Sequence, residues 1–180
     1  MESTMNLYTD YFQSPLGLIE VKASEVGIRQ LIFCGEQVSQ TRSCPLLKEC
    51  NNQLNAYFSS NLTQFDLDLD WQGTPFQQQV WRALTNIPFG KSMTYLELAE
   101  QLNNPKAVRA VGGANGRNPI TLIVPCHRVI GANGKMTGYA GGVFRKQWLL
   151  AHEGIVNSKP STQELEGLIK TRQAKTEFLQ

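Results

Sequence analysis

Residues 120–130 read ITLIVPCHRVI, and this stretch carries the strongest structural signal in the chain. Residues 120–124 form an apolar run that we expect to be buried, and Pro125 then fixes the backbone directly before Cys126. His127 and Arg128 follow. Because nearby positive charge lowers the pKa of a thiol, this pattern is typical of a reactive thiolate. The alternative is that Cys126 is one more buried, unreactive thiol, as most lone cysteines are.

A glycine-rich segment and a helix follow this stretch. Residues 131–142 contain five glycines together with Asn133 and Tyr139, a composition typical of turns that leave room for a planar ligand. Apolar periodicity then predicts a helix over residues 143–153. Glu153 ends that helix, where the helix dipole disfavours an anion. This local cost has a reason if the carboxylate orients His127, as in arrangements of nucleophile, base and orienting group.

Two short helices upstream predict a helix-turn-helix. Thr94 and Glu97 form a capping box that starts the first helix, and a break at Asn103-Asn104-Pro105 precedes a second helix over residues 105–114. The second helix consists largely of alanine and glycine. Small residues of this kind permit close packing against another helix, or a close approach to DNA with Lys106 and Arg109 supplying charge.

The first part of the chain is predicted to form a small sheet with one helix. β-Forming residues predict strands over residues 7–12, 17–23, 28–33 and 65–70 and a helix over residues 46–58. Gln72-Gly73 marks a boundary, after which Thr74 and Gln77 form a capping box at the start of the next helix.

The charges are distributed unevenly. Residues 1–75 carry a net charge of −5 and residues 76–156 a net charge of +6, within a total of +2. A positive segment fits a polyanionic partner, and it fits an ordinary solvated surface equally well.

The remaining composition is typical of a soluble protein of the cytoplasm, or of the nucleus if the source is eukaryotic. No apolar run approaches the length of a membrane span, and the start of the chain lacks the features of a signal peptide. We therefore expect Cys34, Cys44, Cys50 and Cys126 to be free thiols. No histidine precedes His127, so the sequence offers no complete zinc site and we expect no metal.

Three motifs resemble the O6-alkylguanine-DNA alkyltransferase family: PCHRVI at 125–130, GYAGG at 138–142 and WLLAHEG at 148–154. RAVG at 109–112 and RNP at 117–119 also fit. The resemblance and the predicted elements together imply an α+β fold. It has a small N-terminal α/β domain with an antiparallel sheet, then a mainly helical domain with a winged helix-turn-helix-like DNA-binding motif. The expected limits are residues 1–72, residues 73–156 for the catalytic domain, and residues 157–180 for a tail. Ser158-Lys159-Pro160 reads as a linker within that tail, and Leu165, Leu168 and Ile169 fit a short amphipathic helix or a disordered end.

The resemblance implies a role for each residue of the site. Cys126 accepts the alkyl group of O6-alkylguanine irreversibly, while activity on O4-alkylthymine stays open. His127, working through a water and oriented by Glu153, takes the thiol proton. Tyr95 donates to the departing guanine, and Asn118 orders the turn below the nucleophile. The base pocket is expected to be formed by Val129, Tyr139, Ala140 and Gly141.

The implied partner is double-stranded DNA that contains alkylated guanine. No cofactor is expected, and the protein is expected to act as a monomer, with cooperativity on DNA left open. Arg109 fills the gap left by a flipped nucleotide. The other residues expected at the DNA are Thr94, Lys106, Ala110, Gly113, Ala114, Arg117 and Arg128.

Two other functions fit part of the sequence. Alkyltransferase-like proteins recognise alkylated bases without repairing them, but they usually carry tryptophan in place of the acceptor, and Cys126 argues against this alternative. A cysteine hydrolase using Cys126 and His127 would need an unusual dyad of adjacent residues, and it would leave the positive helix-turn-helix unexplained.

Overall fold

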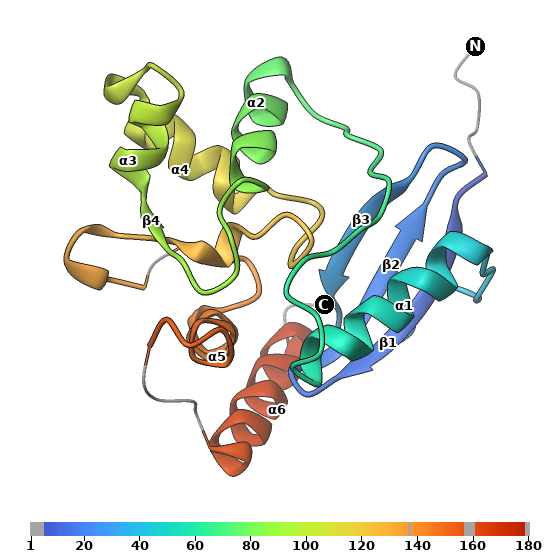
Figure 1. Cartoon of the computed structure of the whole chain (residues 1–180). Helices are drawn as coiled ribbons and strands as arrows, with labels where there is room; N and C mark the ends of the chain where they lie inside the picture. The colour runs from blue at the N-terminus through green and yellow to red at the C-terminus, as the bar shows by residue number, and fades with distance from the viewer. Residues whose placement is uncertain (1–5, 137, 157–160, 179–180) are drawn as a thin grey trace.

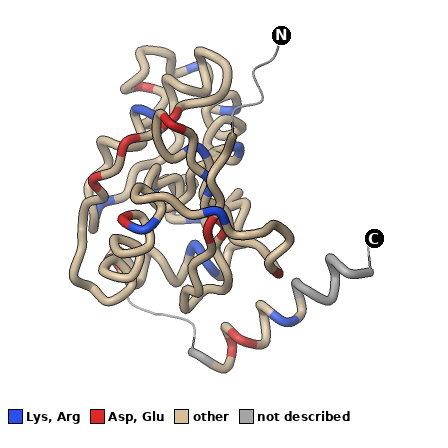
Figure 2. Tube along the Cα trace, turned by 90° about the vertical axis from the view of Figure 1, so that its right-hand side faces the viewer, with Lys and Arg blue, Asp and Glu red and all other residues tan. Residues whose placement is uncertain are grey.

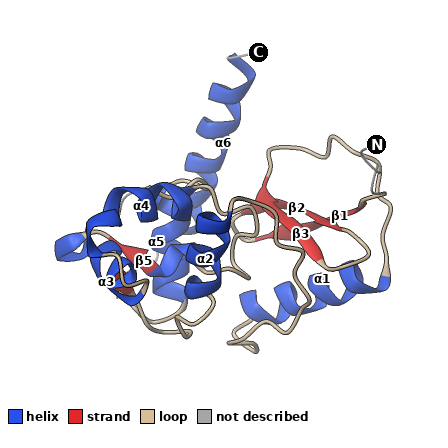
Figure 3. Cartoon of the chain, turned by 90° about the horizontal axis from the view of Figure 1, so that it is seen from above, coloured by secondary structure: helices blue, strands red, loops and turns tan. Residues whose placement is uncertain are grey.

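The computed structural model describes residues 6–136, 138–156 and 161–178. An N-terminal half built on an antiparallel sheet is followed by a helical C-terminal half, and the two lie side by side (Figures 1 and 3). The predicted α+β class is therefore confirmed.

The sheet of the N-terminal half contains three strands in the order β1-β2-β3. Their bounds are β1 Tyr8–Ser14, β2 Gly17–Ala23 and β3 Ile28–Phe33, which confirms the first three predicted strands. The β1–β2 turn is closed by the Ser14 hydroxyl, which accepts from the Leu16 N–H at 3.1 Å and donates to the Gly17 carbonyl at 2.6 Å. Gly17 has a φ of +111°, a conformation that favours glycine.

Helix α1 spans Pro45–Phe58 and supplies the apolar face that covers the sheet (Figure 1). Leu47, Leu54 and Tyr57 are buried in the core between them. Spacings of three and four residues place these side chains on one side of the helix. The predicted helix over residues 46–58 is thus confirmed with one additional residue, Pro45, at its start.

The strand expected over residues 65–70 is wrong. Leu69 forms only an isolated bridge to Ile28. The Gln53 side chain on α1 instead takes both backbone groups of Asp66, at 2.8 and 2.9 Å, so the segment is tied to the helix. Asp70, at the end of this segment, is buried.

Asp70 binds three side chains of the N-terminal half, and its replacement tests how much they stabilise it. Ser24 donates to it at 2.6 Å, Arg29 at 2.7 and 3.0 Å, and Gln72 at 2.9 Å. Burial opposes ionisation, but these hydrogen bonds outweigh it and hold the carboxyl pKa below its usual range.

Asp70→Asn is expected to lower the free energy of unfolding at neutral pH by about 1–3 kcal/mol, because charged hydrogen bonds are lost. A carboxyl pKa that is depressed in the folded protein adds stability above the unfolded pKa, and this stability is lost as pH falls through the folded pKa. The difference between variant and wild type in urea denaturation should therefore shrink on acidification. A difference that does not change with pH would contradict this account.

The C-terminal half begins with helix α2, Pro75–Leu84, and contains the helix-turn-helix α3, Tyr95–Gln101, and α4, Val108–Gly116. Both predicted capping boxes are present, at Thr74 with Gln77 and at Thr94 with Glu97. The short 3₁₀ segment η1, Pro105–Ala107, precedes α4, so the second helix begins as 3₁₀ and continues past the predicted residue 114.

The remaining elements of this half surround the PCHRVI stretch. In chain order they are β4 Met93–Thr94, η2 Cys126–Arg128, β5 Val129–Ile130, η3 Ala132–Gly134 and α5 Val143–His152. Strands β4 and β5 pair in parallel. This pairing joins the start of the helix-turn-helix to the residues that directly follow Cys126.

The small residues of α4 are used mainly for packing. Val111 and Ala114 are buried, and the Trp81 indole N–H on α2 donates to the Ala114 carbonyl at 2.8 Å. Ala110, one turn before Ala114, is exposed. The packing interpretation is therefore correct for the face toward α2. The outer face remains available for an approach to DNA.

Helix α6, Thr162–Phe178, extends away from both halves (Figures 2 and 3). It is longer than the short helix expected, with Leu165 buried, Ile169 partly buried and Leu168 exposed. The linker expected at residues 158–160 lies outside the described residues. In the described part of the chain, no helix has the length and apolar character needed to cross a membrane.

Candidate active site

Cys126 lies at the end of a tight turn formed by residues 118–126. The Asn118 amide donates to the Val124 carbonyl at 2.7 Å and its oxygen accepts from the Ile120 N–H at 2.9 Å. Leu122, buried inside this turn, has a φ of +71°, a conformation that costs a non-glycine residue about 1–3 kcal/mol. Asn118 thus spans the turn that presents Cys126, in the position expected for it.

His127 and Glu153 form a buried pair behind the cysteine. The distance from His127 Nε2 to Glu153 Oε2 is 2.5 Å, and both side chains are fully buried. Burial opposes ionisation of Glu153, but hydrogen bonds from His127 and Arg128 hold its pKa below the usual range. A carboxylate accepts only, so Nε2 carries the proton and Nδ1 holds the lone pair. Nδ1 is buried and has no hydrogen-bond partner among the described side chains and backbone.

Arg128 does not lie where the sequence predicted it. It was expected at the DNA, but it is 6% exposed, with Nε 2.8 Å and Nη2 2.5 Å from Glu153 Oε1. Nη1 donates to the Ile87 carbonyl. A guanidinium held by a buried carboxylate and a carbonyl cannot also bind a phosphate, so Arg128 is a positioning residue for Glu153.

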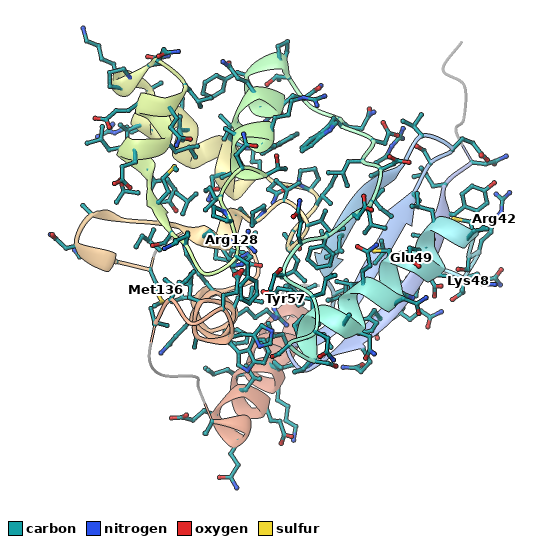
Figure 4. All side chains as sticks on the ribbon, in the orientation of Figure 1. Arg42, Lys48, Glu49, Tyr57, Arg128 and Met136 are labelled. Atoms are coloured by element: carbon teal, nitrogen blue, oxygen red, sulfur yellow. The ribbon has the colours of Figure 1, made fainter. Side chains whose placement is uncertain are left out.

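The two halves of the molecule meet beside this network. His152 Nε2 lies 2.8 Å from the Tyr57 carbonyl, and the His152 ring stacks on Trp148. Figure 4 labels Tyr57 and Arg128 close together between α1 and the C-terminal half. Burial, followed by the charge of Glu153, raises the pKa of Tyr57 well above its ordinary value. The N-terminal half therefore helps to exclude water from the Glu153 pair.

The pKa of the Cys126 thiol is raised, whereas the sequence argument from nearby positive charge predicted a lowered one. The residue is 4% exposed, and burial raises the pKa of its thiol. The hydrogen bond from Asn118 and the charge of Lys146 lower that pKa, but less than burial raises it. The sequence argument assumed that Arg128 faces the sulfur, whereas Arg128 faces Glu153. The thiol therefore needs a base to ionise it.

Lys146 is a site residue that the sequence analysis did not identify. It is fully buried on α5, and its ammonium donates to the Val129 carbonyl at 2.6 Å. Nζ lies 5.9 Å from the centre of the Tyr95 ring. Burial lowers its pKa to about 8, and the negative charge that Cys126 carries when ionised opposes that shift. A lysine on the apolar face of the helix, three and four residues before Leu149 and Leu150, was the available signal.

Lys146→Met should raise the pKa of Cys126, because it removes a buried positive charge beside the sulfur. At neutral pH we expect several-fold slower alkylation by iodoacetamide at this position, with the rate profile displaced toward alkaline pH. Peptide mass spectrometry across a pH series measures both. An unshifted profile would show that Lys146 does not act on the thiol.

The residues expected in the base pocket lie on β5 and on the glycine-rich segment that follows it. The Tyr95 hydroxyl lies 3.5 Å from the position that a Cβ on Gly138 would occupy, so the glycine-rich segment passes directly over Tyr95. Tyr139 is buried, and its hydroxyl has no hydrogen-bond partner among the described groups. Val129 is buried and Ala140 is exposed.

A cleft of about 820 Å³ lies elsewhere, between residues 63–71 and 85–89. Pro125 and Arg128 reach it, but Cys126, Tyr95 and Tyr139 do not line it. This cleft separates the two halves behind the active site. We therefore place the chemistry at Cys126 rather than in this cleft.

The helix-turn-helix presents most of its expected residues outward. Lys106, Arg109, Ala110 and Arg117 are exposed, and Thr94 and Gly113 are partly exposed. Ala114 is 3% exposed beneath α2, so its expected DNA contact is corrected to a packing role.

The fold and the site define a class of protein in which a helix-turn-helix lies beside a buried cysteine and a histidine–glutamate pair. The family model described as "6-O-methylguanine DNA methyltransferase, DNA binding domain" matches residues 75–155, and "6-O-methylguanine DNA methyltransferase, ribonuclease-like domain" matches residues 7–71. The chain belongs to the 6-O-methylguanine DNA methyltransferase family.

Individual relatives agree with this assignment. The chain is 48% identical over 153 residues to a methylated-DNA--protein-cysteine methyltransferase from Methanosarcina mazei, covering 82% of this chain and 97% of the relative. The crystal structure of Mycobacterium tuberculosis O6-methylguanine methyltransferase matches with a TM-score of 0.75 at 42% identity, covering 88% of this chain and 98% of that one. The structure of M. tuberculosis OGT in complex with DNA matches with a TM-score of 0.74 at 44% identity, covering 89% and 98%.

Proposed function

We propose that this protein repairs DNA by direct reversal, transferring the alkyl group of O6-alkylguanine to Cys126. The observation that carries the proposal is the arrangement around that cysteine. A buried thiol follows an Asn118-braced turn, a histidine oriented by Glu153 adjoins it in the chain, and a helix-turn-helix lies beside it. The same reaction on O4-alkylthymine would use the same groups.

The proton of Cys126 passes to His127 in the proposed reaction. Nδ1 is a buried acceptor that no group in the described part of the chain binds, which is the setting that a bridging water satisfies. The sulfur then attacks the alkyl carbon; the S–C bond forms as the C–O6 bond breaks. The Tyr95 hydroxyl donates a hydrogen bond to the departing guanine. Lys146 stabilises the negative charge first on the Cys126 sulfur and then on the departing guanine. The product is a thioether, which offers water no carbonyl to attack, so each molecule reacts once.

The target base has to leave the duplex and reach a thiol that is covered in the resting protein. Extruding a nucleotide costs a few kcal/mol, less where the pair is already damaged. Gly138 closes over the site, near both Tyr95 and Gly116. Gly138 and Gly142 both have positive φ, +69° and +100°, so the backbone can bend at either side of Tyr139. We propose that the backbone at Gly138 moves away from Tyr95 to admit the base.

DNA is proposed to lie along the outer face of the helix-turn-helix, where Lys106 on η1, Arg109 on α4 and Arg117 directly after α4 are exposed. Residues 1–72 would brace the site, residues 73–156 would carry DNA binding and chemistry, and residues 157–180 would form a tail. The proposed active unit is the monomer.

Arg109→Ala should slow repair of O6-methylguanine in duplex DNA by about tenfold or more, while transfer from free O6-benzylguanine stays within about twofold, since a free base needs no extrusion. Single-turnover assays on both substrates measure this. Lys48→Ala, an equal charge change on exposed α1, is the control. Equal losses on both substrates would contradict the flipping role.

The proposed function is tested by the stoichiometry of repair. A duplex with one O6-methylguanine, supplied in excess, should lose one lesion per protein molecule and then no more. The guanine should remain in the strand without the alkyl group. Continued turnover, excision of the base, or binding without loss of the lesion would each contradict direct reversal.

A further inference from the structure

Arg145 joins the N-terminal sheet to the segment over Cys126. It lies on α5 and is 7% exposed. Its Nε donates to the Leu16 carbonyl in the β1–β2 turn at 2.8 Å, and its Nη1 donates to the Gly141 carbonyl at 2.8 Å. One side chain thus binds two segments that are more than 120 residues apart in sequence.

Two aromatic rings, one from each half of the molecule, also contact the Arg145 guanidinium. Its central carbon lies 4.6 Å from the centre of the Phe33 ring, at the end of β3, and 5.0 Å from that of Phe144. Planar arginine stacks favourably on such rings. The β1–β2 turn also lies close to the guanidinium, because a Cβ on Gly17 would lie 3.2 Å from Arg145 Nη2.

Gly141 is closely packed, with no room for a larger side chain. A Cβ at this position would lie 2.7 Å from the Tyr139 ring and 3.3 Å from the Phe33 ring. The segment therefore packs directly on the end of β3. The same strand binds the chain before Cys126, because the Thr121 hydroxyl and N–H both donate to the Leu31 carbonyl. The N-terminal sheet thus holds the pocket segment and the turn that carries the nucleophile.

We propose that Arg145 is a positioning residue that fixes the Gly141 end of the pocket wall, so that the wall moves only at Gly138 when a base enters. This inference rests on the proposed function. The inference makes the N-terminal sheet part of the base pocket. Leu16 and Phe33 of that half contact Arg145, and Arg145 in turn binds Gly141. The hydrogen bonds that Arg145 donates to Leu16 and Gly141 both end on backbone carbonyls, so its replacement should act on the pocket wall.

Arg145→Met tests the inference, because methionine retains an apolar stem but cannot donate to either carbonyl. We expect the O6-benzylguanine concentration for half-maximal transfer to rise about tenfold or more, since small displacements of a positioning wall have large effects. Alkylation of Cys126 by iodoacetamide should not slow. Amide hydrogen exchange should accelerate in residues 138–142 more than in the core. Arg145→Lys, which can serve one carbonyl at a time, should recover part of the affinity.

Arg29→Met is the matched control, since it removes a comparable charged contact in the N-terminal half, with Asp70, away from the pocket. It should lower stability and leave the half-maximal concentration unchanged. If wild type takes up no benzyl group, the proposed function fails. If wild type reacts and Arg145→Met matches it, or if Arg29→Met produces the same rise, the positioning role is wrong.

Discussion

Glu153→Gln is expected to reduce both transfer and stability strongly. The substitution leaves the Arg128 guanidinium buried without its counter-charge and removes the acceptor that orients His127. Breaking a buried ion pair by changing one partner costs about 3–5 kcal/mol. Loss of an oriented general base slows the chemical step by about 100-fold or more. Single-turnover transfer and urea denaturation measure the two effects.

The acid dependence of stability distinguishes this mechanism from a loss of packing. The pKa of Glu153 is depressed in the folded protein, so its stabilisation is present above the unfolded carboxyl pKa and is lost as pH falls through the folded pKa. The gap between wild type and Glu153→Gln should narrow on acidification. Glu49→Gln, on the exposed surface of α1 (Figure 4), should change stability by less than about 0.5 kcal/mol. A wild-type transfer rate in Glu153→Gln would contradict the role of the pair.

Cys126→Ala is expected to abolish transfer while DNA binding persists. The methyl side chain has no nucleophile, and the charged residues proposed to bind DNA lie elsewhere: Lys106 on η1, Arg109 on α4 and Arg117 directly after α4. Lesion removal should fall to background, and the dissociation constant for a lesion-containing duplex should stay within about threefold of wild type, because no DNA-binding group is changed. Gel-shift titration and a lesion assay on the same samples measure both.

Cys34→Ala provides the control for this variant. Cys34 is partly exposed and so more accessible than Cys126, but its pKa is raised by burial and by the charge of Glu20. Transfer should be unaffected. If Cys126→Ala keeps residual transfer and this transfer disappears when Cys34 is also replaced, then Cys34 accepts the alkyl group. That result would contradict the account.

Local features of the sequence predicted the fold well. The capping boxes at Thr74 and Thr94 depend on residues three positions apart, and both form as expected. The strand expected over residues 65–70 failed because alternation alone cannot show that Gln53, on another element, binds the backbone of Asp66. Pairing with a partner distant in sequence decided that segment.

The active site shows the same limit. Sequence placed Arg128 beside a thiol or at DNA, but its partner Glu153 lies 25 residues away and holds it in the interior. Ala114 was placed at the DNA from the family resemblance, and the position of α2 decides that it packs. The burial of Lys146 follows from the rotation of α5 and could be anticipated only from its neighbours on that helix.

The most direct test of the account is the mass of the peptide that contains Cys126 after the protein has been incubated with a duplex carrying O6-methylguanine. The account predicts that this peptide becomes heavier by one CH₂ unit, that fragmentation places the addition on the sulfur, and that the other three cysteines stay unmodified. An unmodified Cys126 peptide in a sample whose lesion has been repaired would contradict it.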